Sequence, residues 1–165
     1  MLKSRYALLA IVAIAVLAMN SGCNGGITNP MTQLDPGALS VDFPDGSELL
    51  VQSGTIYSIN GSNYIVTAIS NVSGANDGDE ITLTVPIDTT VPYTVSSESN
   101  GAVDVTYNDN ETQANYEGKM GQGNCTITIT QTSPTLIGNF SAEEVGTSTS
   151  DTIELTNGQF NATPQ

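Results

Sequence analysis

Strict alternation of apolar and polar residues dominates the chain from Ala38 onward. Ile81, Leu83 and Val85 alternate with threonines, and Ile127 and Ile129 do so again. A period of two with β-branched residues predicts strands that bury one face. Further strands are predicted at 48–52, 55–59, 64–70, 93–97, 102–107, 136–142 and 152–156.

No segment after residue 37 keeps apolar residues at helical spacing. We therefore predict a single all-β domain at 38–165, which forms an antiparallel β-sandwich or a flattened barrel of about eight to ten strands. The two cysteines do not suggest a disulfide scaffold, so its stability should come from packing.

Two Asn-Gly pairs indicate turns, because both residue types tolerate a positive φ. Asn60-Gly61 predicts a hairpin that sets Tyr57 opposite Tyr64. In this register, residues of the same type are paired on both faces of the hairpin.

Asn157-Gly158 allows two interpretations. A hairpin at this pair would set Leu155 opposite Phe160. A bulge within one continuous strand would use the same glycine.

The first 22 residues have the proportions of an export signal. Lys3 and Arg5 precede the apolar run 6–19, which is shorter than the roughly 20 residues a transmembrane helix needs. Ser21 and Gly22 then precede Cys23. This ending resembles the lipobox of bacterial lipoproteins, and the resemblance implies that Cys23 receives a diacylglycerol and becomes the N-terminus.

One position departs from the lipobox pattern, because Asn20 stands where Leu, Val or Ile is usual. The alternative is ordinary cleavage after Ala18, with Val16 and Ala18 as the small residues recognised and no lipid anchor. The segment 23–37 is rich in Gly, Pro and Asn, and is predicted to be a flexible tether. Asn24 follows the cysteine, which by resemblance to enteric sorting favours the outer membrane or the cell surface within the cell envelope.

Removal of the signal would leave Lys119 as the only basic residue against 17 carboxylates. Such a charge repels phosphate backbones, so we expect no nucleic-acid partner. The expected partners are the membrane, through the lipid anchor, and an envelope protein or a glycan. Solubility accounts for the acidity more simply than attraction of cations does.

Few residues are suited to catalysis, because the chain has no histidine. Cys125 shares a strand face with Ile127 and Ile129, which favours a core thiol over a nucleophile. Adjacent Glu143 and Glu144 would point to opposite faces of a strand and cannot act as one carboxylate pair. We therefore expect a protein that is not an enzyme.

A calcium ion is the one cofactor the sequence suggests. Asp77, Asp79 and Glu80 lie in one acidic loop, and carboxylates on a loop are hard ligands that Ca²⁺ accepts. Asp, Asn and Gly are also the residues that tight turns use, and this turn interpretation is the commoner one.

The C-terminal third carries a second resemblance. A Thr/Ile-rich strand is followed by Gly138-x-Phe140, and the chain closes with a Thr-Asn-Gly-x-Phe-Asn strand that contains Asn157, Gly158 and Phe160. These motifs resemble a family of small bacterial lipoproteins of uncharacterised function. The resemblance implies an envelope-anchored all-β domain with no known ligand.

The functional expectation is a cell-envelope lipoprotein whose non-catalytic β-domain binds a ligand or a protein. One alternative is a structural or adhesive subunit of a surface assembly, because a single lysine protects few strand edges from pairing. A weaker alternative is a carbohydrate-active enzyme that uses a carboxylate pair.

Overall fold

The computed structural model describes residues 33–71, 76–148 and 151–165, and the predicted signal and most of the tether lie outside them. Eleven strands of one sheet fill the described part, which contains no helix. The all-β class is confirmed, with one strand more than the upper end of the expected range. The strands are β1 (Ala38–Asp42), β2 (Glu48–Val51), β3 (Ile56–Asn60), β4 (Asn63–Ile69), β5 (Glu80–Pro86), β6 (Tyr93–Ser96), β7 (Asp104–Asp109), β8 (Ala114–Lys119), β9 (Asn124–Gln131), β10 (Leu136–Gly146) and β11 (Thr152–Pro164).

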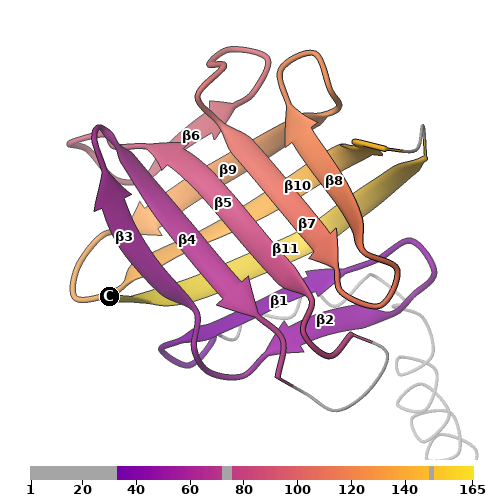
Figure 1. The fold of residues 1–165 in the computed structure, drawn as a ribbon. Helices are drawn as coiled ribbons and strands as arrows, with labels where there is room; N and C mark the ends of the chain where they lie inside the picture. Colours follow the sequence, from indigo (N-terminus) through magenta and orange to yellow (C-terminus); the bar gives the residue numbers. More distant parts are fainter. Residues whose placement is uncertain (1–32, 72–75, 149–150) are drawn as a thin grey trace, which may run out of the picture. The chain divides into compact units, whose positions relative to one another are not determined.

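The sheet folds into two layers whose strands cross (Figure 1). One layer has the order β3-β4-β5-β7-β8, and the other has the order β2-β1-β11-β10-β9-β6. Crossed packing of this kind brings the inner faces of both layers into one core.

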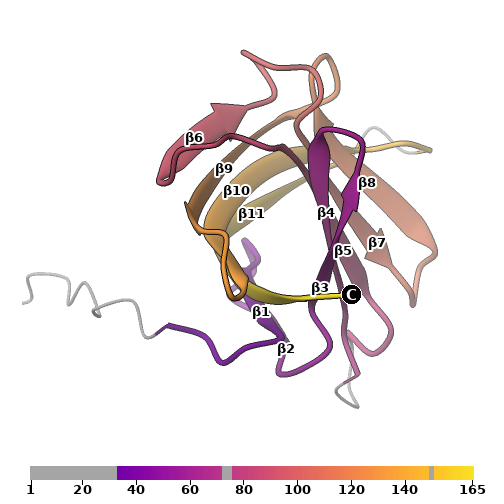
Figure 2. The ribbon, with the colours of Figure 1, turned by 90° about the vertical axis from the view of Figure 1, so that its left-hand side faces the viewer.

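The two layers join at two corners, which closes a ring of strands (Figure 2). At one corner Thr163 of β11 pairs with Ile56 of β3, in the one parallel pairing of the described strands. At the other corner Val145 of β10 pairs with Glu117 of β8. Of the two predicted architectures, this closure corresponds to the flattened barrel.

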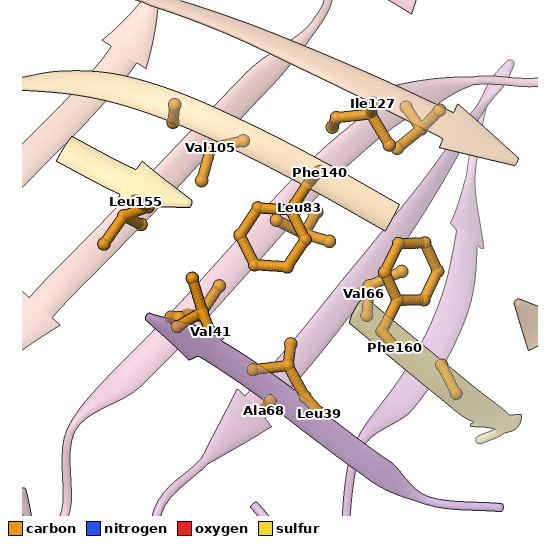
Figure 3. Packing of buried hydrophobic residues seen from close by; sticks show 14 of the residues in the cluster. Leu39, Val41, Val66, Ala68, Leu83, Val105, Ile127, Phe140, Leu155 and Phe160 are labelled. Carbon is orange, nitrogen blue, oxygen red and sulfur yellow. The ribbon is translucent and has the colours of Figure 1, made fainter. Parts of the chain in front are cut away.

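Alternating residues from both layers fill the interior. Phe140 and Phe160 lie next to each other in the core with ring centroids 6.5 Å apart, facing Leu83 and Val66 of the other layer (Figure 3). Full burial of such side chains stabilises the fold by roughly 1.5–3 kcal/mol each. The alternation seen in the sequence therefore produces the core that was expected from it.

The β3–β4 hairpin is confirmed, but its predicted register is wrong. Tyr57 pairs with Val66, and Ile59 pairs with Tyr64. Gly61 carries a φ of 62° as the first of two loop residues, which is the position where a type II′ turn needs glycine. The shift keeps like faces together, and the Tyr57 and Tyr64 rings still meet edge to face at 5.7 Å.

Of the two interpretations of Asn157-Gly158, the bulge is confirmed and the hairpin is wrong, because β11 continues through this pair. Phe140 pairs with Gly158, whereas Ala142 pairs with Leu155, so the register shifts by one residue in between. Asn157 adopts a φ of 53° there and donates a hydrogen bond to Asp42 Oδ2 at 2.9 Å. The bulge thus fastens β11 to the end of β1.

The residues just before β1 are attached to the barrel. Gly37 donates its amide to the Asn161 carbonyl at 2.7 Å, and Asn161 donates its side-chain amide to the Leu34 carbonyl at 2.7 Å. Leu34 and Gly37, which lie in the predicted tether, are therefore hydrogen-bonded to Asn161 of β11. Among the described residues there is no helix with the length and hydrophobicity to cross a membrane.

Candidate functional site: an acidic groove beside β11

A groove of about 580 Å³ lies beside the first half of β11. Residues of β9, β10 and β11 line it together with Pro44, which follows β1. Side chains that give it a polar surface include Asn124, Ser141, Glu143, Thr152 and Glu154.

Two carboxylates lie side by side in this groove. Glu143 of β10 and Glu154 of β11 are directly opposite each other in the antiparallel register, and both are exposed. Opposite residues of a strand pair have their Cβ atoms roughly 4.5–5.5 Å apart on one face, where two like charges destabilise the sheet. Asn124 Nδ2 donates a hydrogen bond to Glu143 Oε2 at 3.3 Å. This hydrogen bond satisfies one carboxylate oxygen of the pair and neutralises neither charge.

No basic side chain in the described part of the chain neutralises these carboxylates. Lys119 is the only basic residue there, and it forms its ion pair with Glu117. The groove therefore offers two negative charges, an amide and hydroxyl groups to any molecule that enters it. This arrangement suits a ligand that carries a positive charge.

The predicted calcium ligands do not converge in the structure. Asp79 is buried, and its carboxylate accepts hydrogen bonds from the Tyr107 hydroxyl at 2.6 Å and from the Asn110 amide at 2.9 Å. Asp77 is exposed, whereas Glu80 accepts a hydrogen bond from Thr82. Within the described residues, no group of three or more His, Cys, Asp or Glu residues is arranged to hold a metal ion.

Asp79 instead fastens the loop before β5 to the end of β7. Burial of the Tyr107 hydroxyl, followed by its hydrogen bond to the Asp79 carboxylate, raises the pKa of that phenol far above the usual value for tyrosine. The neighbouring Asp109 caps a turn, accepting bonds from the amides of Glu111 and Thr112 at 2.9 Å and 3.0 Å. The carboxylates of Asp79 and Asp109 both accept hydrogen bonds from backbone amides of a loop, as the turn interpretation expects.

Glu143 and Glu144 point to opposite faces of β10, as predicted. The Glu144 side chain is fully buried, and neither carboxylate oxygen has a hydrogen-bond partner. Gly118 of β8 leaves room for it, because a Cβ at that glycine would lie 3.2 Å from Glu144 Cγ. Burial, followed by the nearby negative charge of Asp104, raises the pKa of Glu144 to about 9.

Cys125 is in the core, as the alternation predicts. It is 1% exposed, and burial raises the pKa of its thiol to about 11. A thiol at this pKa is almost entirely protonated at neutral pH and is a poor nucleophile.

The other predicted residues divide into two groups. The motif residues Gly138, Phe140, Gly158 and Phe160 form the contact between β10 and β11 inside the barrel. Ser21, Gly22 and Cys23 lie outside the described residues.

The pairing of Glu143 with Glu154 was not predicted from the sequence. It depends on the register of β10 with β11 and on the one-residue shift at the bulge. The signal that could have found it is the Gly-x-Phe spacing present in both strands. A phenylalanine set opposite each glycine gives the correct register up to the bulge.

Comparison with protein-family models gives a match over residues 51–164 to a family described as a domain of unknown function (DUF6252). A search of curated proteins found no match. A search of solved structures found none either.

Proposed function

Because the chain belongs to the DUF6252 family of domains of unknown function, we propose a function from its own geometry. The protein is a cell-envelope lipoprotein, anchored through Cys23, whose β-domain binds and does not catalyse. Its acidic groove receives a positively charged group of a ligand or an envelope protein. This group would lie between Glu143 and Glu154.

The observation that carries this proposal is the unneutralised pairing of Glu143 with Glu154. Like charges directly opposite in a sheet cost stability, whereas an opposite charge placed there would contribute roughly 0.2–1 kcal/mol. A bound cation would therefore convert an unfavourable pair into a favourable one. The lining amide and hydroxyls would orient the ligand through hydrogen bonds.

Binding without catalysis agrees with the residue types available. The chain has no histidine to act as a general base near neutral pH. Cys125 is buried in the core with a protonated thiol. The groove itself offers carboxylates, an amide and hydroxyls, which are suited to recognition.

Titration with hexalysine at low ionic strength tests the binding proposal. The full chain in non-ionic detergent should bind this probe, and the Glu143→Gln, Glu154→Gln double variant should bind it at least fivefold more weakly. Glu98→Gln/Glu48→Gln is the matched control, because it removes two exposed carboxylates outside the groove. If both double variants weakened hexalysine binding equally, net charge alone would explain the loss, and the proposal would be wrong.

Metabolic labelling with palmitate tests the anchor in the native host. The wild-type chain should incorporate label and partition into detergent, whereas Cys23→Ser should do neither. Equal labelling and partitioning of the two chains would contradict lipidation at Cys23.

The same carboxylate pair supports a second candidate, a carbohydrate-active enzyme. Retaining glycosidases hold two carboxyl groups roughly 5–5.5 Å apart, and two glutamates whose Cβ atoms are roughly 4.5–5.5 Å apart can bring their carboxyl groups to that separation. Hydrolysis of a polysaccharide panel by wild type and its loss in Glu154→Gln would favour this candidate over binding alone.

A surface-assembly subunit is supported by the two outermost strands. β2 and β6 each have one side without a strand partner among the described residues. Neither strand carries a lysine, the residue that most often protects an edge from pairing. Concentration-dependent assembly in light scattering would favour this candidate.

A further inference from the structure

The first four residues of β11 have a free side. Residues 152–155 pair with β10 on one side, whereas the pairing of β11 with β1 ends at Thr156. Successive residues of a strand direct their backbone N–H and C=O groups to alternate sides. Within the described residues, half of the polar backbone groups of 152–155 therefore point to a side without a strand partner.

The chain after β1 keeps this side free. Continuation of β1 in register would place Phe43 opposite Leu155 and Pro44 opposite Glu154. The pairing nevertheless ends at Asp42, and the Phe43 amide donates to the Ser47 carbonyl at 2.9 Å in the turn towards β2. Pro44 has no amide hydrogen to donate to a neighbouring strand, so the ladder cannot continue through it.

The acidic groove follows the backbone of this free segment. All four residues from Thr152 to Leu155 line it, although their side chains alternate between the two faces of the sheet. The groove also contacts Pro44, which would be opposite Glu154 if β1 continued, so it extends over the free edge of β11. Its occupant can therefore reach the unpaired backbone groups.

The charges along this edge select the kind of strand that could pair there. Asn124, Glu143 and Glu154 form one row across β9, β10 and β11. The next position in that row would belong to the added strand, directly opposite Glu154. A lysine or arginine at that position would face two carboxylates.

A second copy of this chain does not meet this requirement. The whole chain carries a net charge of −14, and its described part has a single lysine, which is already paired. The carboxylates of the edge would repel the same edge of another copy, as charged residues on natural edge strands do. The charge of the edge therefore argues against a second copy of this chain as the occupant.

We infer that the edge of β11 at residues 152–155 binds an extended basic segment of a partner protein, which adds to the sheet as a further strand. Main-chain hydrogen bonds hold the segment, and a lysine or arginine opposite Glu154 provides selectivity. This inference rests on the proposed function and names the class of partner for the acidic groove.

The experiment compares two peptides of equal charge on the full chain in detergent. The first is acetyl-Thr-Lys-Val-Lys-Val-Lys-Thr-amide, which places its lysines on one face when extended. The second has the same sequence with the central backbone amides N-methylated, which prevents strand pairing and keeps the charge. Calorimetry should show at least tenfold weaker binding of the methylated peptide, and hydrogen exchange should show new protection within 152–155.

The outcomes separate this inference from the proposed function. Equal binding of both peptides, weakened in the Glu143→Gln, Glu154→Gln variant, would overturn strand addition and leave cation binding in place. Binding of hexalysine without binding of either peptide would do the same. Protection at β2 or β6 instead of β11 would overturn the assigned edge. Failure of hexalysine and both peptides to bind would overturn both proposals.

Discussion

Gly158 of β11 lies directly opposite Phe140 of β10, and the aromatic ring occupies the space where a side chain at Gly158 would begin. A Cβ at Gly158 would lie 2.6 Å from Phe140 Cε1. The relationship is reciprocal, since a Cβ at Gly138 would lie 2.6 Å from Phe160 Cζ. Each ring covers the glycine of the neighbouring strand, which explains why Gly-x-Phe occurs once in each strand.

Gly158→Ala should destabilise the domain by about 1–3 kcal/mol, because the new methyl group overpacks the core. Chemical denaturation measures this loss. The same change in a Phe140→Leu background should cost less, since the smaller side chain leaves room. Gly101→Ala is the control, because its Cβ would make an ordinary contact at 3.5 Å with Met120, and it should change stability by less than about 0.5 kcal/mol.

Glu144 should make the stability of the domain fall as pH rises. Its pKa is about 9 in the folded chain against 4.5 as the usual value, so between these values the native state holds a proton that the unfolded state has released. Such a difference lowers the free energy of unfolding by at most about 1.4 kcal/mol per pH unit. Urea denaturation at a series of pH values should show this slope.

Glu144→Gln should remove most of the slope, so that the variant gains stability over wild type as pH rises from 5 to 8. Glu143→Gln is the matched control, because it changes the neighbouring residue on the exposed face of the same strand. Identical pH slopes in wild type and Glu144→Gln would show that Glu144 does not hold a proton in the folded state.

Asp79→Asn should destabilise the domain by about 1–3 kcal/mol in calcium-free buffer, because it weakens the buried hydrogen bond from Tyr107. Tyr107→Phe should cost a similar amount, and the double variant should cost less than the sum of the two changes. Thermal unfolding with a chelator measures these effects. A loss that appeared only in the presence of Ca²⁺ would instead support the calcium site predicted from the sequence.

Cys125 should react slowly with a thiol reagent in the folded protein. Burial and the pKa of about 11 keep the thiol inaccessible and protonated. In a Cys23→Ser background, mass spectrometry should show modification that accelerates sharply when denaturant unfolds the barrel. Rapid labelling under native conditions would contradict the inward orientation of the β9 side chains.

The sequence predicted the strands that obey a local rule. β5 and β9 alternate threonine with aliphatic residues, and their inward faces follow directly from that period. β8 was missed, because Ala, Asn, Glu, Gly and Lys in its sequence are all depleted in strands. It is a strand because β7 pairs along its whole length.

The acidic groove depends on contacts between residues distant in the sequence, which the alternation of apolar and polar residues does not specify. Glu143 lies opposite Glu154 only because the bulge at Asn157 places one extra residue in β11. The burial of Glu144 likewise depends on the extension of β10 to Gly146 and on the side-chain-free position at Gly118. Alternation specified which face each glutamate occupies and did not specify its neighbour.

Neutralising one of the two paired glutamates in the acidic groove should stabilise the unliganded protein. Glu154→Gln removes the repulsion with Glu143 and should raise the free energy of unfolding by about a few tenths of a kcal/mol at low ionic strength. Salt should reduce the gain, because both side chains are exposed and screened. A gain in stability together with a loss of hexalysine binding would indicate that the pair is kept for recognition. If Glu154→Gln destabilised the protein, the pair would have a structural role, and the groove would lose its main support as a binding site.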